Sequence, residues 1–299
     1  MKFSGVSAAM EGFRLIGRKP GTFLVWCAAY FAVLIAIGVL TFIVAGPALM
    51  AAAQRGPQAP MSPAQSLQMV WPIMLVVYPA ILLWSAIFYC AIFRAILRPK
   101  DNGLAYLKIG ADELRVILLV IVMALLGFAI WLVGGMVLAL LIGVVTATLG
   151  KAAIFADILI GLLAFCAYIW VCVRLCLLLP VTFAERRIDI PAAWRLTRGH
   201  FWSLVGMFLL DFVMVIGVVL ACYLVVGVMF AGAVLGAMGG HAHPVAPQFG
   251  VMAIAGGLLM LALYFVIPTL MAVVMISPFA AAYRDLTGPK ESEAAKVFA

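Results

Sequence analysis

The chain has 299 residues, of which 68% are hydrophobic and only 10% are charged. This composition excludes a soluble globular domain, because so few polar side chains cannot cover the water-facing surface of a protein of this size. The net charge of +8 is spread over the ends of apolar segments and forms no separate basic domain. Nucleic acid is therefore not an expected partner.

Six apolar segments follow one another along the chain. They cover residues 22–50, 67–97, 114–145, 152–183, 201–236 and 249–282. Each exceeds the roughly 20 residues that a helix needs to cross a hydrocarbon core. We therefore predict an all-α polytopic bundle of six transmembrane helices, forming a single integral membrane domain over residues 1–299.

Lysine and arginine lie mostly on alternate connections between these segments. One side has Lys2, Arg14, Arg18, Lys19, Arg94, Arg98, Lys100, Lys108, Arg115, Arg186, Arg187, Arg195, Arg198, Arg284, Lys290 and Lys296. The other side has Arg55 and Lys151. Because cytoplasmic connections are enriched in lysine and arginine, this asymmetry predicts that both termini are cytoplasmic.

Short amphipathic segments precede the three outgoing spans, near residues 3–18, 106–115 and 190–201, and they predict helices lying along the cytoplasmic surface. Aromatic and basic side chains occur together in each segment, which suits contact with anionic phospholipid or an acidic protein partner. Ordinary anchoring by positive charge is the alternative. The candidate contact residues are Phe13, Arg14, Arg18, Tyr106, Lys108, Trp194, Arg195 and Arg198.

This order of an amphipathic segment and two spans occurs three times. We interpret it as three divergent repeats covering residues 3–100, 101–187 and 188–286, with residues 287–299 as a flexible cytoplasmic tail. The last two repeats end alike, because Pro180 and Pro278 each lie six residues before an arginine. The first departs from this pattern, with Ile92 at the corresponding place before Arg98.

Three stretches also carry a family resemblance. Residues 173–187 read Val-Arg-Leu-Cys-Leu-Leu-Leu-Pro-Val-Thr-Phe-Ala-Glu-Arg-Arg, residues 193–202 read Ala-Trp-Arg-Leu-Thr-Arg-Gly-His-Phe-Trp, and residues 278–286 read Pro-Phe-Ala-Ala-Ala-Tyr-Arg-Asp-Leu. They resemble bacterial membrane proteins related to the membrane domain of glycerophosphoryl diester phosphodiesterases, and YciC-like inner-membrane proteins. The resemblance implies a helical protein of the bacterial inner membrane. It carries no catalytic residue, because the soluble phosphodiesterase domain of fused members has no counterpart in these 299 residues.

Arg174 and Asp211 are the most notable charges within the apolar segments. Each lies roughly ten residues from the cytoplasmic end of its span, and a rise of about 1.5 Å per residue places both about 15 Å deep. A lone charge there costs about 2.5–3.5 kcal/mol on insertion scales. We therefore predict that the two residues form an ion pair between the fourth and fifth spans, in direct or water-bridged contact. A polar cavity or substrate path containing them is the alternative.

No arrangement of residues in the sequence indicates catalysis. The 11 acidic residues are mostly scattered singly, the six cysteines lie in apolar segments, and His241 and His243 have no nearby acidic or thiol partner. We expect no metal and no cofactor. The predicted function is that of a noncatalytic scaffold or accessory protein that engages anionic phospholipid or a membrane-protein partner in envelope or lipid metabolism. The alternative is a transporter or lipid-handling channel with a polar site at Arg174 and Asp211.

Overall fold

The computed structural model describes residues 4–54, 63–100, 103–150, 153–238 and 246–288, and every regular element in these ranges is a helix. The elements are α1 (Gly5–Ala9), α2 (Glu11–Arg18), α3 (Pro20–Gln54), α4 (Pro63–Leu97), the 3-10 turn η1 (Gly103–Tyr106), α5 (Ala111–Leu149), α6 (Ala153–Leu175), α7 (Leu178–Glu185), α8 (Ile190–Thr197), α9 (Phe201–Met238) and α10 (Ala246–Thr287). The six long helices confirm the predicted all-α polytopic bundle, with bounds close to the expected segments.

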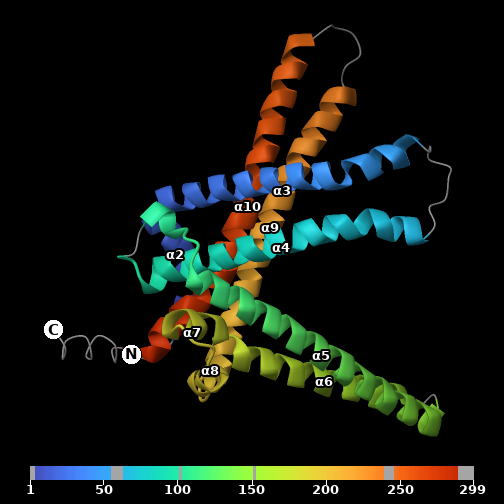
Figure 1. Cartoon of the computed structure of the whole chain (residues 1–299), viewed down its shortest axis with the longest axis vertical. Helices are drawn as coiled ribbons and strands as arrows, with labels where there is room; N and C mark the ends of the chain where they lie inside the picture. Colours follow the sequence, from blue (N-terminus) through green and yellow to red (C-terminus); the bar gives the residue numbers. More distant parts are fainter. Residues whose placement is uncertain (1–3, 55–62, 101–102, 151–152, 239–245, 289–299) are drawn as a thin grey trace.

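The long helices form three hairpins, α3 with α4, α5 with α6, and α9 with α10. Figure 1 shows that the hairpins meet at one end and that their far ends point apart. The short helices α2, α7 and α8 lie where the hairpins meet in Figure 1, and α1 packs there against α9 and α10. We call this region the hub. It comprises these four helices and η1, together with residues 19–26, 86–99, 112–119, 173–175, 201–207 and 273–288 at the ends of the long helices.

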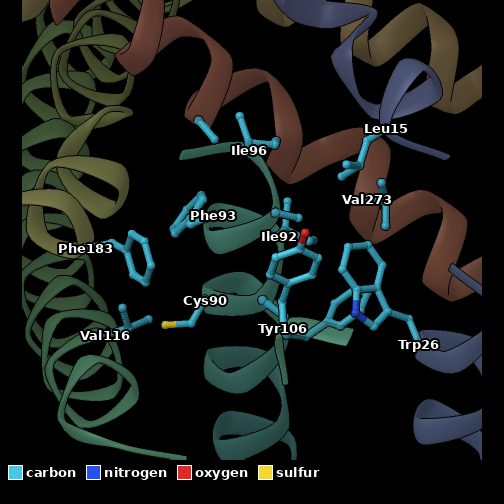
Figure 2. Packing of buried hydrophobic residues seen from close by; sticks show 14 of the residues in the cluster. Leu15, Trp26, Cys90, Ile92, Phe93, Ile96, Tyr106, Val116, Phe183 and Val273 are labelled. Carbon is cyan, nitrogen blue, oxygen red and sulfur yellow. The ribbon is translucent and has the colours of Figure 1, made fainter. Parts of the chain in front are cut away.

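The apolar core of the protein lies in the hub. One cluster of buried side chains packs the end of α4 against α2, α7 and α10, and includes Leu15, Ile92, Phe93, Phe183 and Val273 (Figure 2). A second cluster packs α1, α7 and α8 against the start of α9 and the end of α10. Helix α10 contributes most, since 44% of its most hydrophobic stretch is buried, against 6–17% for the other spans.

The outer parts of the hairpins expose large apolar side chains. Phe155 is 84% exposed, Trp131 72% and Tyr223 71%. Apolar surface of this extent is unstable in water and is covered by lipid in a membrane, where helices satisfy their own backbone hydrogen bonds. The chain is therefore an integral, multi-pass membrane protein.

The fourth span departs from expectation. We predicted one helix over 152–183, but α6 ends at Leu175 and the separate helix α7 begins at Leu178. Pro180 gives a physical reason, because a proline ring clashes with the carbonyl four residues earlier, here that of Cys176. Arg186 ends α7 in a left-handed conformation, with a φ of 56°. By contrast, α10 continues through Pro278.

The prediction that three short segments are helical is partly correct. The first segment forms α1 and α2, which meet at Met10, and the third forms α8, whose first turn is capped by the Asp189 carboxylate accepting from the Ala192 amide at 2.8 Å. The second prediction is wrong. Residues 103–106 form η1, residues 107–110 are not helical, and Asp112 and Glu113 lie in the first turn of α5 itself.

Two glycines bring the first helices close to the spans. A Cβ atom at Gly5 would lie 2.5 Å from the Ser203 carbonyl oxygen of α9. A Cβ at Gly12 would lie 2.9 Å from the Cα of Val274 in α10. Both distances are shorter than side-chain atoms tolerate, so α1 and α2 pack directly on the backbone of the last hairpin.

Candidate functional site

A buried ionic cluster joins the first two hairpins within the hub. Arg94 of α4 pairs with Glu113 of α5, and their side chains are 4% and 2% exposed. Asp112 extends the cluster, with carboxylate oxygens 2.8 Å from Arg115, 3.6 Å from Arg98 and 3.9 Å from Arg94. Charges buried this deeply are stable only when paired. The cluster therefore fixes how the end of α4 meets the start of α5.

Helix α7 joins this cluster through Phe183. The guanidinium groups of Arg94 and Arg98 lie 5.8 and 4.9 Å from the centre of its ring. Arg98 also donates to the carbonyl oxygens of Phe183 and Ala184, each at 3.4 Å. Cation–π and hydrogen-bond contacts thus hold the end of α7 against α4.

Tyr106 is buried in the hub, next to Trp26 in Figure 2. Its side chain is buried, its hydroxyl donates to the Pro99 carbonyl at 3.1 Å, and Lys19 donates to that hydroxyl. Ala105 and Tyr106 both have positive φ, 53° and 67°, which is unusual for residues with a side chain. Their carbonyl oxygens accept from Trp26 Nε1 at 2.8 Å and from Arg94 at 3.2 Å. These contacts hold the strained turn in place.

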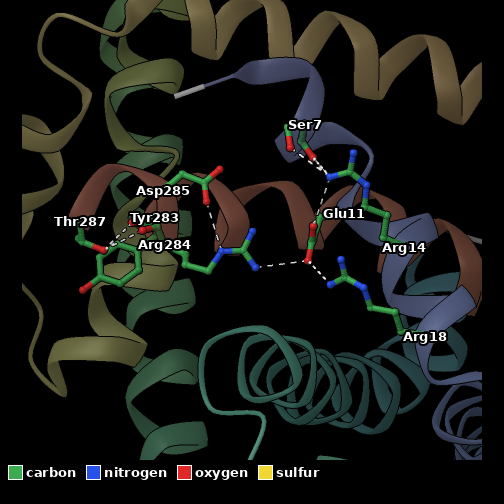
Figure 3. Close-up of polar contacts among 8 residues, drawn as sticks. All are labelled: Ser7, Glu11, Arg14, Arg18, Tyr283, Arg284, Asp285 and Thr287. Atoms are coloured by element: carbon green, nitrogen blue, oxygen red, sulfur yellow. Dashed lines mark hydrogen bonds and ion pairs between the residues drawn. The ribbon is translucent and has the colours of Figure 1, made fainter. Parts of the chain in front are cut away.

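A second ionic cluster, shown in Figure 3, joins the N-terminal helices to the end of the last hairpin. The buried carboxylate of Glu11 in α2 lies 3.3 Å from Arg284 of α10, 3.4 Å from Arg18 and 3.9 Å from Arg14. Arg284 also lies 3.2 Å from Asp285. One carboxylate therefore collects three arginines and ties α2 to the C-terminal end of α10.

Two open pockets lie in the hub. One has a volume of about 300 Å³ and is lined by Leu97, Arg98, Ala184, Tyr283, Arg284, Thr287 and Gly288. The other has a volume of about 480 Å³ and is lined by Lys19, Gly21, Thr22, Val25, Pro99, Ala105 and Tyr106. Both adjoin the ends of membrane spans, the depth at which lipid headgroups lie.

The candidate contact residues divide into exposed and buried sets. Phe13, Arg14, Arg18, Lys108, Arg195 and Arg198 are exposed, as the prediction requires. Tyr106 is 3% exposed, so its proposed role as a membrane-contacting aromatic is wrong. Trp194 is half-buried, since its ring packs edge-on against Trp170 at 5.1 Å. Periodicity alone could not separate the aromatic rings that face lipid from those that pack inward.

Between Val6 and Phe13 the larger apolar side chains point away from the protein, whereas Leu15, later in α2, packs into the core. Val6 is 64% exposed, Met10 40% and Phe13 36%, whereas Ala8 and Ala9 face the spans. Apolar side chains turned outward beside arginines are typical of a helix at a membrane surface. The interfacial position of this segment stays a prediction, and these exposed side chains favour it.

Arg174 and Asp211 form no ion pair in the part of the chain that the structure describes. Arg174 lies in the last turn of α6, 5.5 Å from the Trp170 ring centre and 5.6 Å from that of Trp194. Asp211 is 8% exposed, and its Oδ1 has no hydrogen-bond partner among the described residues. The direct contact predicted between them is therefore wrong. Our depth argument treated 152–183 as one helix, but the break after Leu175 leaves Arg174 at a helix end.

Among the described residues, no group of three or more His, Cys, Asp or Glu side chains could hold a metal ion. His241 and His243 lie outside the described residues, as do Arg55 and Lys151. The cysteines of the described helices are unpaired. The ionic groups described above join helices of the hub to one another.

The Arg94–Glu113 pair and the Glu11 cluster are the features that sequence reasoning missed. Arg94 lies one turn from Arg98, a position from which an arginine side chain can also extend to the membrane surface. A usable signal did exist, since Asp112 and Glu113 are adjacent acids at the start of a span that follows an arginine-rich connection. Acidic groups there also complement the positive end of the α5 dipole.

Fold and hub together define an integral membrane protein made of three helical hairpins. Comparison with protein-family models, with curated proteins and with solved structures finds no match to the chain.

Proposed function

We propose that this protein is a noncatalytic scaffold or accessory factor of the bacterial inner membrane, with both termini in the cytoplasm. Its role is to engage anionic phospholipid through the hub and to present the diverging hairpins to lipid or to a membrane-protein partner in envelope or lipid metabolism. The resemblance noted for residues 173–202 and 278–286 supports the location, and the lysine and arginine asymmetry supports the orientation.

The observation that carries this proposal is the arrangement of exposed cations at the hub. Arg195 in α8 and Arg198 at the C-cap of this helix are exposed and have no carboxylate partner in the described part of the chain. Each such cation near an anionic leaflet contributes about 1 kcal/mol to binding. The carboxylates of the hub are meanwhile occupied by internal arginines, so the charge presented to the surface is positive.

Lipid analysis of the purified protein tests this role. We expect anionic phospholipid to be enriched over its share of the surrounding membrane, and the double substitution Arg195→Gln with Arg198→Gln to reduce the enrichment. The charge-preserving pair Arg195→Lys with Arg198→Lys is the matched control and should retain it. A wild-type lipid content equal to that of the bulk membrane would refute the proposal.

A lipid-handling channel is the second candidate, favoured by Asp211. A buried carboxylate oxygen without a partner on a membrane helix is costly, and such residues commonly line polar paths. Against it, Arg174 and Asp211 form no ion pair in the described part of the chain, so no direct contact joins them into one polar site. Reconstituted vesicles test this candidate, because a channel would accelerate lipid movement between leaflets and Asp211→Asn would change that rate.

A further inference from the structure

The larger pocket of the hub combines three features that suit a phosphate group attached to lipid chains. Lys19 supplies a cation, the first turn of α3 supplies Gly21 and Thr22, and Val25 supplies an apolar wall one turn further into the span. We propose that this pocket binds the phosphate headgroup of an anionic phospholipid, with the acyl chains running along α3. This inference rests on the proposed lipid-engaging function and assigns that function a specific site.

Lys19 has an unneutralised charge, which is the main argument for an anionic ligand. Its amino group donates to the Tyr106 hydroxyl and lies 4.7 Å from the centre of that ring. No carboxylate lies within ion-pairing distance of it in the described part of the chain, and none lines the pocket. An ammonium group has three donors, so two are left for the oxygens of a ligand.

Tyr106 fixes where this cation points. Its hydroxyl donates to Pro99 and accepts from Lys19, so both partners of the hydroxyl are set by the hub. The ring is 3% exposed and cannot turn without disturbing the core. Lys19 is therefore held at the pocket wall and is half-buried, unlike the freely exposed cations of α8.

The start of α3 adds hydrogen-bond donors. Pro20 begins the helix and the Phe23 amide makes the first bond, to the Lys19 carbonyl at 3.2 Å. The amides of Gly21 and Thr22 therefore precede the first intrahelical bond, where helix amides favour an anion. A Cβ added at Gly21 would meet no atom within 4 Å, so the space beside it is open.

The apolar part of the proposed ligand also has a matching surface. The span of α3 begins at Pro20, so the pocket lies where the polar and apolar layers of a membrane meet. Leu24 and Val25, in the next turn, are 65% and 42% exposed. A phosphate group bound beside Lys19 therefore places the acyl chains against these exposed apolar side chains, which are stable when lipid covers them. A free phosphate shares the headgroup chemistry but would not use this surface.

The smaller pocket suits an anion less well, although it contains two arginines. Arg98 is paired with Asp112 and two carbonyl oxygens, and Arg284 is paired with Glu11 and Asp285. Binding an anion there would weaken contacts that hold the hub together. Charge balance therefore favours the pocket at Lys19.

Native mass spectrometry of the detergent-purified full chain tests the assignment, with phosphatidylglycerol, phosphatidylcholine of the same chains, and inorganic phosphate as separate probes. We expect phosphatidylglycerol to bind the wild type more tightly than phosphatidylcholine. Lys19→Gln should weaken its binding about fivefold, the effect of one cation near an anionic lipid. Lys19→Arg should retain binding. Lys100→Gln removes an exposed cation outside the pocket and should change nothing.

Gly21→Leu provides a second variant that keeps Lys19 and its contact with Tyr106. The added side chain occupies space at the pocket and should also weaken phosphatidylglycerol binding, with an unchanged thermal midpoint. Unaltered binding in both Lys19→Gln and Gly21→Leu would overturn the site. The proposed function would survive that result if Arg195→Gln with Arg198→Gln still lost lipid. Lys19-dependent binding of inorganic phosphate, with no binding of phosphatidylglycerol, would assign the pocket to free phosphate and overturn the lipid.

Discussion

Replacing Gly12 by alanine tests how closely α2 packs on the last hairpin. The added Cβ would lie 2.9 Å from the Val274 Cα and 3.1 Å from the Val273 carbonyl oxygen. Both are backbone atoms of α10, which is buried at this point and cannot move aside as a side chain would. We therefore expect α2 to shift away from α10 and the protein to lose stability.

The magnitude follows from two opposing terms. Alanine in place of glycine favours a helix by up to about 1 kcal/mol, whereas overpacking a tight contact costs about 1–3 kcal/mol. Gly17, also in α2, isolates the first term, because a Cβ there would meet no atom within 4 Å. The difference between Gly12→Ala and Gly17→Ala is therefore the packing cost alone, about 1–3 kcal/mol.

Thermal unfolding in detergent, followed by the fraction that elutes as folded protein in size-exclusion chromatography, ranks the three proteins. We expect Gly17→Ala to match or exceed the wild type and Gly12→Ala to fall several degrees below Gly17→Ala. Equal midpoints for the two variants would refute the close approach of α2 and α10.

Three further predictions concern polar groups. Glu113→Gln should cost about 3–5 kcal/mol in unfolding free energy, because it leaves Arg94 buried without its main partner. Adding Arg94→Met should recover part of the loss. Purely additive effects in the double variant would contradict the pairing. Trp26→Phe removes a hydrogen bond to a backbone carbonyl and should cost about 1–3 kcal/mol in the same melting assay. Arg174→Gln and Asp211→Asn should change the unfolding free energy independently, with an interaction energy below about 0.5 kcal/mol. A larger interaction energy would indicate that the two residues do form an ion pair.

The spans could be predicted because membrane thickness sets the length of an apolar helix. Predicted and observed bounds differ by a few residues in five of the six cases, as for 67–97 against Pro63–Leu97. The fourth span shows the limit of this reasoning. Apolar composition continues from α6 into α7 without a change, so hydropathy detects no boundary, and proline permits either a break, as at Pro180, or a continuous helix, as at Pro278.

The buried charges were harder to predict, because depth alone does not fix which way a side chain points. Arg174 and Asp211 were matched by distance from their span ends, but contact between helices also depends on rotation about each axis. The ion pairs that the structure does show between helices join residues on either side of a connecting turn, or residues near opposite ends of the chain. Glu11 and Arg284 are separated by 273 positions, and no local pattern in the sequence connects them.

Tyr106 shows the same limit for aromatic residues. Next to Lys108 at the end of a polar connection, it matched the pattern of a headgroup anchor. In the structure, a turn with two consecutive positive φ angles buries Tyr106. Glycine or asparagine would indicate such a conformation in the sequence, but positions 105 and 106 are alanine and tyrosine. Tertiary contacts with Trp26, Arg94 and Lys19 stabilise this turn, and the sequence around residues 105 and 106 does not predict them.

The polar contacts of the hub decide how the hairpins are oriented. Their outer parts point apart (Figure 1), so the angles between them are set mainly where they meet. Helix α5 has 39 residues, which at 1.5 Å per residue makes it about 58 Å long, so a small rotation at Glu113 becomes a large displacement at the far end. Ion pairs and bonds to guanidinium groups are directional, whereas apolar packing tolerates sliding. Arg94 with Glu113 orients the second hairpin on the first, and Glu11 with Arg284 orients the third on α2. Lys19 adjoins both connections through Tyr106 and through α2, so a ligand at its pocket would bind where the hairpin angles are set.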